Sequence, residues 1–243
     1  MQSSLEWRTP AVNLIVSVCR ALANRLRLHL LLTVYSSPGL SVAQIADRVG
    51  RPISAVSRHL RQLGQYQMVE ARPSGRHVYY HPPKPGSTRS EFLTGLQKLL
   101  TQTLVAGRLN CTLAQVCNDS EKPSSRPNAA SARQGRRRTP VGKVCPGWEP
   151  VFQEMIRCFT AYTHLRRLLC LRLMLQGKRL VQAAMRTEIG MSVYAVSRQT
   201  RKLTRRGVLR PCKDEDGWEL DVQRSRKFQQ ALFDLVKAAL KRE

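Results

Sequence analysis

A short segment rich in serine and arginine occurs twice in this chain of 243 residues. Residues 53–63 read ISAVSRHLRQL and residues 193–203 read VYAVSRQTRKL. Both contain Ala-Val-Ser-Arg, which ends at Arg58 in the first copy and at Arg198 in the second. Arginine binds guanine edges and phosphates, and small hydroxyls contact bases or backbone. One copy alone is equally compatible with a solvated surface helix, but two copies in matching contexts favour contacts with DNA.

The apolar residues of the repeated segment predict a helix. Val56, Leu60 and Leu63 recur at i, i+4 and i+7, which places them on one stripe that can be buried. The serines and arginines then lie toward the other side, as in a helix that enters the major groove. We expect DNA contacts from residues on and beside the two helices: Arg51, Ser54, Ser57, Arg58 and Arg61 in the first copy, and Tyr194, Ser197, Arg198, Arg201 and Lys202 in the second.

A preceding helix must position the first of these segments. Residues 42–49, VAQIADRV, form a short amphipathic stretch, and Ser41 is placed to cap it. Gly50 follows and allows a tight turn, although a glycine here is also compatible with a simple helix end. A short helix, a glycine turn and a second basic helix is the order of a helix-turn-helix.

Two β-prone segments come next. Residues 67–71 and 76–81 flank a Pro-Ser-Gly turn, which predicts a hairpin, the wing of a winged helix-turn-helix. Arg76 and His77 stand beside this uncharged turn and are expected to approach phosphate. The corresponding tip in the second half, residues 213–217, is acidic, so we expect only the first wing to touch DNA.

The apolar pattern of the first half returns in the second. Pro10 corresponds to Pro150 and Gly50 to Gly190. Each half ends in a predicted closing helix, with apolar residues Phe92, Leu96, Leu99 and Leu100 in the first and Phe228, Leu232, Leu235 and Val236 in the second. The sequence therefore predicts a mainly α protein with small β-wings. Two tandem winged helix-turn-helix domains, at residues 1–110 and 148–243, would be joined by a flexible basic linker at residues 111–147.

The charge of the chain also bears on its partners. The net charge is +25, and residues 1–110, 111–146 and 147–243 contribute +10, +5 and +10. Such a field predicts a polyanionic partner, with double-stranded DNA ahead of a membrane. No apolar run reaches the ~18 residues of a membrane span, and the N-terminus lacks the order of a signal peptide. Seven cysteines, an odd number, fit a reducing compartment, so we expect a cytoplasmic location.

Together these segments resemble the ArsR-type winged-helix repressors. The likeness is close over about residues 10–107, where it rests on LANRLRLHLLL and on LSVAQIADRVGRPISAVSRHLRQLGQYQMVEARPSGRHVYYH. It is looser over about residues 150–240, where Thr200 replaces the usual leucine. The resemblance implies pairing through the first and last helices and recognition of an operator by the fourth helix.

One departure from the family concerns metals. Metal-sensing members place a cysteine pair on the helix before the turn, or a His/Asp set on the last helix. Residues 42–49 contain no cysteine, and residues 92–104 contain neither His nor Asp. Cys111, Cys117 and Cys145 lie around the predicted linker and would converge on a metal only by chance. We expect no metal site and no cofactor.

The preferred interpretation is a sequence-specific DNA-binding transcriptional regulator, a repressor by resemblance. The alternative is a low-specificity architectural or plasmid or phage maintenance protein that binds DNA. The chain shows no Ser/His/Asp order, paired carboxylates, phosphate loop or zinc spacing, so we expect no catalytic residues and no enzyme.

The presence of two predicted recognition helices on one chain also bears on how the protein assembles. A linker of about 36 flexible residues reaches ~30–36 Å, enough for the halves to pack together. We expect an intramolecular pseudo-dimer formed through the first and last helices of each half, with a homodimer of chains as the alternative. Its two reading surfaces would differ, with Ser54 and His59 on one and Tyr194 and Gln199 on the other.

Overall fold

The computed structural model describes residues 9–84, 86–88, 90–119, 147–177, 180–212, 217–221 and 227–241, and only the backbone of residues 106–119. Within these residues the elements of the first half are α1 (Pro10–Leu22), α2 (Arg25–Ser36), β1 (Leu40–Ser41), α3 (Val42–Val49), α4 (Ile53–Gln65), β2 (Glu70–Ser74), β3 (His77–His81) and α5 (Glu91–Asp119). Those of the second half are α6 (Trp148–Ala161), α7 (Leu165–Leu175), α8 (Gln182–Ile189), α9 (Val193–Arg205), β4 (Leu209–Pro211), β5 (Trp218–Leu220) and α10 (Lys227–Lys241).

Local chemistry explains where the helices of the first half begin and turn. The Asn24 side chain accepts from the Arg27 backbone N–H at the start of α2. Ser41 and Gln44 form a reciprocal capping box at the start of α3. Gly50 adopts φ +61°, a left-handed conformation that costs glycine little, and so lets the chain turn into α4. The predicted helix, glycine turn and basic helix are present.

The predicted wing is present as well. β2 and β3 pair in antiparallel register from Glu70 opposite His81 to Ser74 opposite His77. β1 adds a third strand through Leu40 opposite Tyr80, giving the order β1-β3-β2. The hairpin therefore extends from a small sheet that is anchored beside α3.

The second half repeats these features at a constant separation. α8 begins at Gln182 and α9 at Val193, with the same spacing as Val42 and Ile53 at the starts of α3 and α4. Gly190 between α8 and α9 has φ +67°, and Leu180 forms a bridge with Trp218, as Leu40 pairs with Tyr80. The second wing is shorter, since β4 and β5 contain three residues each, and residues 213–216 at its tip lie outside the described part of the chain.

The closing helices are tied to the wings by the same bond in both halves. Gln97 of α5 donates through Nε2 to the carbonyl of Gln67 at 2.7 Å, and Gln229 of α10 donates to the carbonyl of Gly207 at 2.8 Å. Gln67 and Gly207 share a positive φ, of 57° and 67°. The bonds thus pair Gln97 with Gln229, whereas the apolar pattern pairs Phe92 with Phe228. The two alignments differ by four residues, about one helical turn.

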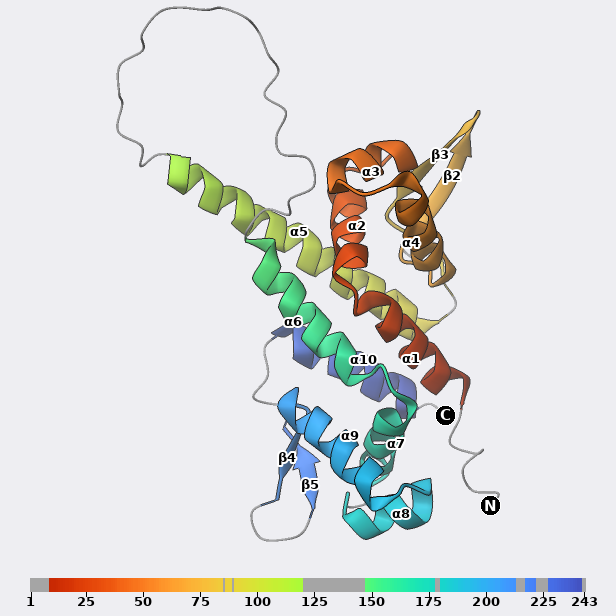
Figure 1. Cartoon of the computed structure of the whole chain (residues 1–243), viewed down its shortest axis with the longest axis vertical. Helices are drawn as coiled ribbons and strands as arrows, with labels where there is room; N and C mark the ends of the chain where they lie inside the picture. The colour runs from red at the N-terminus through yellow and green to blue at the C-terminus, as the bar shows by residue number, and fades with distance from the viewer. Residues whose placement is uncertain are drawn as a thin grey trace, which may run out of the picture.

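The two halves pack against each other through helices from both. Figure 1 shows α3 and α4 near one end of the long axis and α8 and α9 at the other, with α1, α5, α6 and α10 between them. α1 contacts α6, and α5 contacts α10. At the second contact a Cβ on Gly95 would overlap Leu235 Cδ2, so glycine allows the close approach. Arg25 and Glu149 add an ion pair between the halves at 2.6 Å.

The predicted boundary between the first domain and the linker falls inside α5. This helix continues to Asp119, beyond the predicted boundary at residue 110. The rest of the predicted linker, up to residue 146, lies outside the described residues.

In the described part of the chain, no helix has both the length and the apolar character needed to cross a membrane.

Candidate nucleic-acid interface

The first recognition helix, α4, is anchored by its apolar stripe. Val56, Leu60 and Leu63 are fully buried, as their spacing predicted. The opposite side carries the predicted contact residues: Ser54, Arg58 and Arg61 are exposed, Ser57 is half-buried, and Arg51 is exposed in the turn before the helix. The structure therefore brings all five together on one solvent-facing surface.

A partly buried polar contact holds α4 against α2. Arg27 donates through Nη1 to Gln62 Oε1 at 2.8 Å, and the same atom lies 3.4 Å from His59 Nδ1. Burial, and then the nearby Arg27 and Arg58, lower the pKa of His59. His59 is half-buried beside Arg27, and its place on the reading surface stays a prediction.

The first wing presents polar side chains at its tip. Arg76 and His77 are exposed where β2 turns into β3. Nearer its base, Arg72 is paired with Glu70 at 2.9 Å, so Arg72 adds little net charge. Burial raises the pKa of Tyr80 in β3, an effect that the neighbouring Arg61 partly opposes. Arg61 of α4 thus lies within electrostatic range of Tyr80 in the wing.

The helix α9, which the sequence predicts to be a second recognition helix, has a backbone arrangement similar to that of α4 but different exposed side chains. Val196 and Leu203 are buried, while Tyr194, Ser197, Arg198 and Arg201 are exposed and Lys202 is half-buried. Thr200, at the position of Leu60, is tolerated in the interior because its hydroxyl donates to the Val196 carbonyl at 3.0 Å. Gln199 is only 4% exposed, so the prediction that it contributes to the reading surface is also wrong.

Two exposed apolar residues also lie on the candidate interface, and the sequence prediction did not include them. Ile53 and Val193 occupy the first position of α4 and α9 and are 53% and 45% exposed. Tyr194, beside Val193, is 89% exposed. Apolar side chains on a recognition helix contact the C5-methyl group of thymine. Their place outside the i, i+4, i+7 stripe was the sequence signal that could have revealed them.

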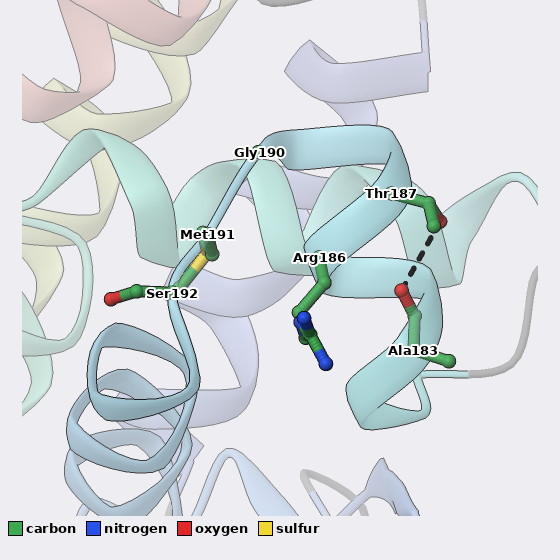
Figure 2. A pocket seen from close by; sticks show the side chains of 6 residues that line it. All are labelled: Ala183, Arg186, Thr187, Gly190, Met191 and Ser192. Carbon is green, nitrogen blue, oxygen red and sulfur yellow. Dashed lines mark hydrogen bonds between the residues drawn. The ribbon is translucent and has the colours of Figure 1, made fainter.

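A concave surface of about 610 Å³ adjoins the second recognition helix (Figure 2). It lies between α8 and the start of α9 and is lined by Ala183, Arg186, Thr187, Gly190, Met191 and Ser192. Arg186 extends from α8 toward this hollow, and the Ser192 hydroxyl caps α9 by accepting from the Ala195 N–H. A cation beside a helix N-terminus suits a phosphate group. Arg186 was not among the predicted contact residues.

Among the described free cysteines, Cys19, Cys158 and Cys170 are buried and Cys212 is half-buried. Among the described side chains, no group of three or more His, Cys, Asp or Glu residues is arranged to hold a metal ion. Burial raises the pKa of the Cys19 thiol and raises that of Cys170 to about 12, so both stay protonated and unreactive at neutral pH. Cys111, Cys117 and Cys145 lie outside the side chains that the structure describes.

The geometry of the first half defines a winged helix-turn-helix: two helices around a left-handed glycine, a basic outer face on the second, and an antiparallel hairpin beside it. Comparison with known proteins agrees over this region. The family HVO_A0114 matches residues 22–82. The HTH-type transcriptional regulator KmtR of Mycobacterium tuberculosis is 35% identical over 69 residues, which are 28% of this chain and 52% of KmtR. This chain thus spans about half the length of that curated relative.

The N-terminal region is similar in sequence to winged helix-turn-helix regulators of the ArsR type. Among solved structures, reduced HlyU from Vibrio cholerae is 27% identical, with a TM-score of 0.30, over 37% of this chain and 87% of HlyU. KmtR is named as a transcriptional regulator, which agrees with the expectation that this chain is not an enzyme.

Proposed function

We propose that this protein is a sequence-specific DNA-binding transcriptional regulator with two winged helix-turn-helix units in one chain. The observation that carries the proposal is α4, whose buried stripe turns Ser54, Arg58 and Arg61 outward beside a basic wing. Serine and arginine on such a helix supply the hydrogen bonds that read bases in the major groove. The likeness of 69 residues to the transcriptional regulator KmtR supports the same role.

The second unit is proposed from its agreement with the first. Its helices α8 and α9 follow one another with the spacing of α3 and α4, and the left-handed glycine between them is repeated. The bonds from Gln97 and Gln229 to the start of each wing provide an independent match, since neither belongs to the helix-turn-helix. We infer that α9 also reads DNA, through Tyr194, Ser197, Arg198 and Arg201.

The two units would act as an intramolecular pseudo-dimer. The contacts of α1 with α6 and of α5 with α10 support this arrangement, as does the Arg25–Glu149 ion pair. Regulators that bind two half-sites present their two recognition helices about one DNA turn, ~34–36 Å, apart. Because Ser54 of one unit corresponds to Tyr194 of the other, the preferred operator should be asymmetric rather than palindromic.

A low-specificity architectural protein would share the positive charge but would not prefer one DNA sequence over another. Selection of bound sequences from random DNA, followed by footprinting of the selected site, separates the two functions. A specific regulator should bind its site about 10³–10⁷-fold more tightly than unrelated DNA at the same salt concentration. Affinity should also fall by about 10³–10⁵ between 50 and 200 mM salt if six to ten phosphates are neutralised.

Each outcome of this experiment has a clear meaning. An affinity that hardly changes with salt would overturn DNA binding itself. A strong salt dependence without a selected sequence would favour the architectural alternative. Light scattering of the protein on its site tests the pseudo-dimer, and a stable dimer of chains on a perfect palindrome would refute it.

A further inference from the structure

A cluster of cations lies where the first half meets the second. Three guanidinium groups converge on the end of α6 and the residues that follow it. Arg167 of α7 donates to the Thr160 carbonyl at 2.5 Å and to Thr163 Oγ1 at 2.9 Å. Arg206, after α9, donates to Thr160 Oγ1 at 2.8 Å. Arg20 of α1 donates to the Thr163 carbonyl at 2.8 Å, so the first half contributes to the cluster.

The first half treats the equivalent arginine differently. Arg27, the counterpart of Arg167 in the repeat, bonds to Gln62 and lies beside His59. Lys202 stands at the position of Gln62, and Arg206 stands at the position of Tyr66. Two neutral neighbours in the first half have therefore been replaced by two cations in the second. The neighbourhood that satisfies Arg27 has become one that repels Arg167.

Arg167 has a hydrogen-bonding capacity that this neighbourhood does not use. Its side chain is 5% exposed, and its Nε has no partner in the structure. Burial, with Arg206 and Arg20 nearby, lowers its pKa to about 10. Within the described residues, no carboxylate forms an ion pair with Arg20, Arg167, Lys202 or Arg206; the ion pairs found there involve other arginines.

Buried charge in proteins is normally paired, because an unpaired donor or cation in the interior is costly. A phosphate group supplies oxygens that accept from guanidinium groups, which is what the unused donor of Arg167 requires. Arg20 is exposed and Lys202 and Arg206 are half-buried, so the cluster is open to solvent on that side.

We propose that Arg20, Arg167, Lys202 and Arg206 form a binding site for a phosphate-type oxyanion at the junction of the two halves. Arg20 comes from the first half and the other cations from the second, so an occupied site would hold the halves together. Two sources share this chemistry: a free phosphate or phosphorylated small molecule, and a phosphate of the DNA backbone. The site stands on its own geometry and does not depend on base recognition by α4 or α9.

The test uses the full chain without DNA and inorganic phosphate as the probe. Thermal unfolding is compared in phosphate and in chloride at equal ionic strength, beside isothermal titration calorimetry. At a phosphate concentration about ten times its Kd, the unfolding midpoint should rise by about 3–5 °C. The variant Lys202→Gln with Arg206→Tyr carries the residues of the first half, and it should lose most of this rise and bind phosphate at least tenfold more weakly.

Controls separate the site from general attraction to a basic protein. Arg205→Gln removes a charge from the same helix without touching the cluster, and it should respond to phosphate like the unchanged protein. Lys202→Gln alone should give an intermediate response, which keeps the test valid if the double exchange reduces folding. An equal response of all variants, or no saturable binding, would overturn the proposal.

Adding the selected duplex distinguishes the two sources of phosphate. If DNA displaces the bound ion, and the double exchange lowers the slope of log affinity against log salt by about 1, the site holds a backbone phosphate. If phosphate stays bound beside DNA, the site serves a free oxyanion. Both outcomes retain the site, and neither depends on whether Arg58 and Arg198 read bases.

Discussion

The two halves support α4 and α9, the proposed recognition helices, with the same backbone features but with different polar partners. Gly50 and Gly190 turn the chain with nearly the same dihedral angles. Val56 in α4 and Val196 in α9 are both buried on the inner side of their helix. Behind the first helix, Arg27 contacts neutral groups, whereas Arg167 behind the second is surrounded by cations. Backbone turns and apolar stripes tolerate little change because they determine the path of the chain, but polar partners can be exchanged wherever another group or ligand compensates.

The reading surfaces differ in the same manner. Each begins with an exposed β-branched residue and continues with a serine and an arginine at matching positions. The second residue is a small serine in α4 and a highly exposed tyrosine in α9. A shared helix with a bulky tyrosine in place of a serine predicts that α4 and α9 would prefer related but unequal DNA half-sites.

The largest effect is expected where the halves meet. Gly95→Leu in α5 would force a side chain into the space of Leu235 in α10, and such overpacking costs about 1–3 kcal/mol. Denaturant unfolding measures the loss, and Leu235→Ala in the same chain should recover part of it. Gly64→Ala is the control, because its Cβ would meet nothing closer than 3.9 Å and should stabilise α4 by up to about 1 kcal/mol. If Gly95→Leu proved as harmless as this control, the packing of α5 on α10 would be refuted.

The arginines test whether both helices read DNA. Arg58→Ala and Arg198→Ala should each weaken binding to the selected site by about 1–3 kcal/mol without changing the unfolding midpoint. In a footprint, each variant should lose protection over a different half of an asymmetric site. Arg205→Ala, exposed at the end of α9, serves as the matched control and should change affinity much less. Equal weakening on every sequence would show that the two arginines contact phosphate only.

The exposed aliphatic residues make a smaller and more local prediction. If Ile53 and Val193 contact thymine methyl groups, replacing single thymines by uracil should weaken binding about fourfold, equivalent to ~0.8 kcal/mol for one buried carbon. The sensitive thymines should fall in one half-site for each residue. Ile53→Ala should abolish the uracil effect in its own half-site and leave the other unchanged. Uracil effects that persist in Ile53→Ala would assign the methyl contact elsewhere.

The smallest effect concerns the helix caps, where the halves use different chemistry. His164 Nδ1 accepts from the Arg166 N–H, whereas Asn24 performs the equivalent task in the first half. Burial, and then the surrounding cations led by Arg167, lower the pKa of His164 from its ordinary value of 6.5. Below pH 6.5 the unfolded chain therefore takes up a proton that the folded chain resists, and stability should decline as the pH falls.

His164→Asn should reduce this decline while leaving stability near pH 8 almost unchanged. Unfolding midpoints between pH 8 and pH 5 measure it, and the contributions of His29 and His59 remain in both proteins. Identical pH profiles of the two proteins would show that the cap is not protonated on unfolding.

Much of the fold and of the first reading surface could be predicted from residue types and spacing. Periodic apolar positions predicted α4 and its outward serines, Gly50 predicted the turn, and the Pro-Ser-Gly sequence predicted the wing. These features are local, because each depends on residues within a few positions of one another. Polar residues on the recognition helices were less predictable: Gln199 is buried although Arg198 beside it is exposed.

The sequence by itself determined the elements, the repeated frame and the excess of positive charge, since helix periodicity, glycine turns and charge need no long-range information. Only the tertiary structure decided which side chains meet. Gln62, which accepts from Arg27, lies on a helix that is distant in the sequence. Arg20 meets Thr163 of the other half, and Gly95 owes its importance to Leu235 on another helix. The junction cluster around Arg167 exists because the packing of α1, α6, α7 and α9 brings together cations that are far apart along the chain.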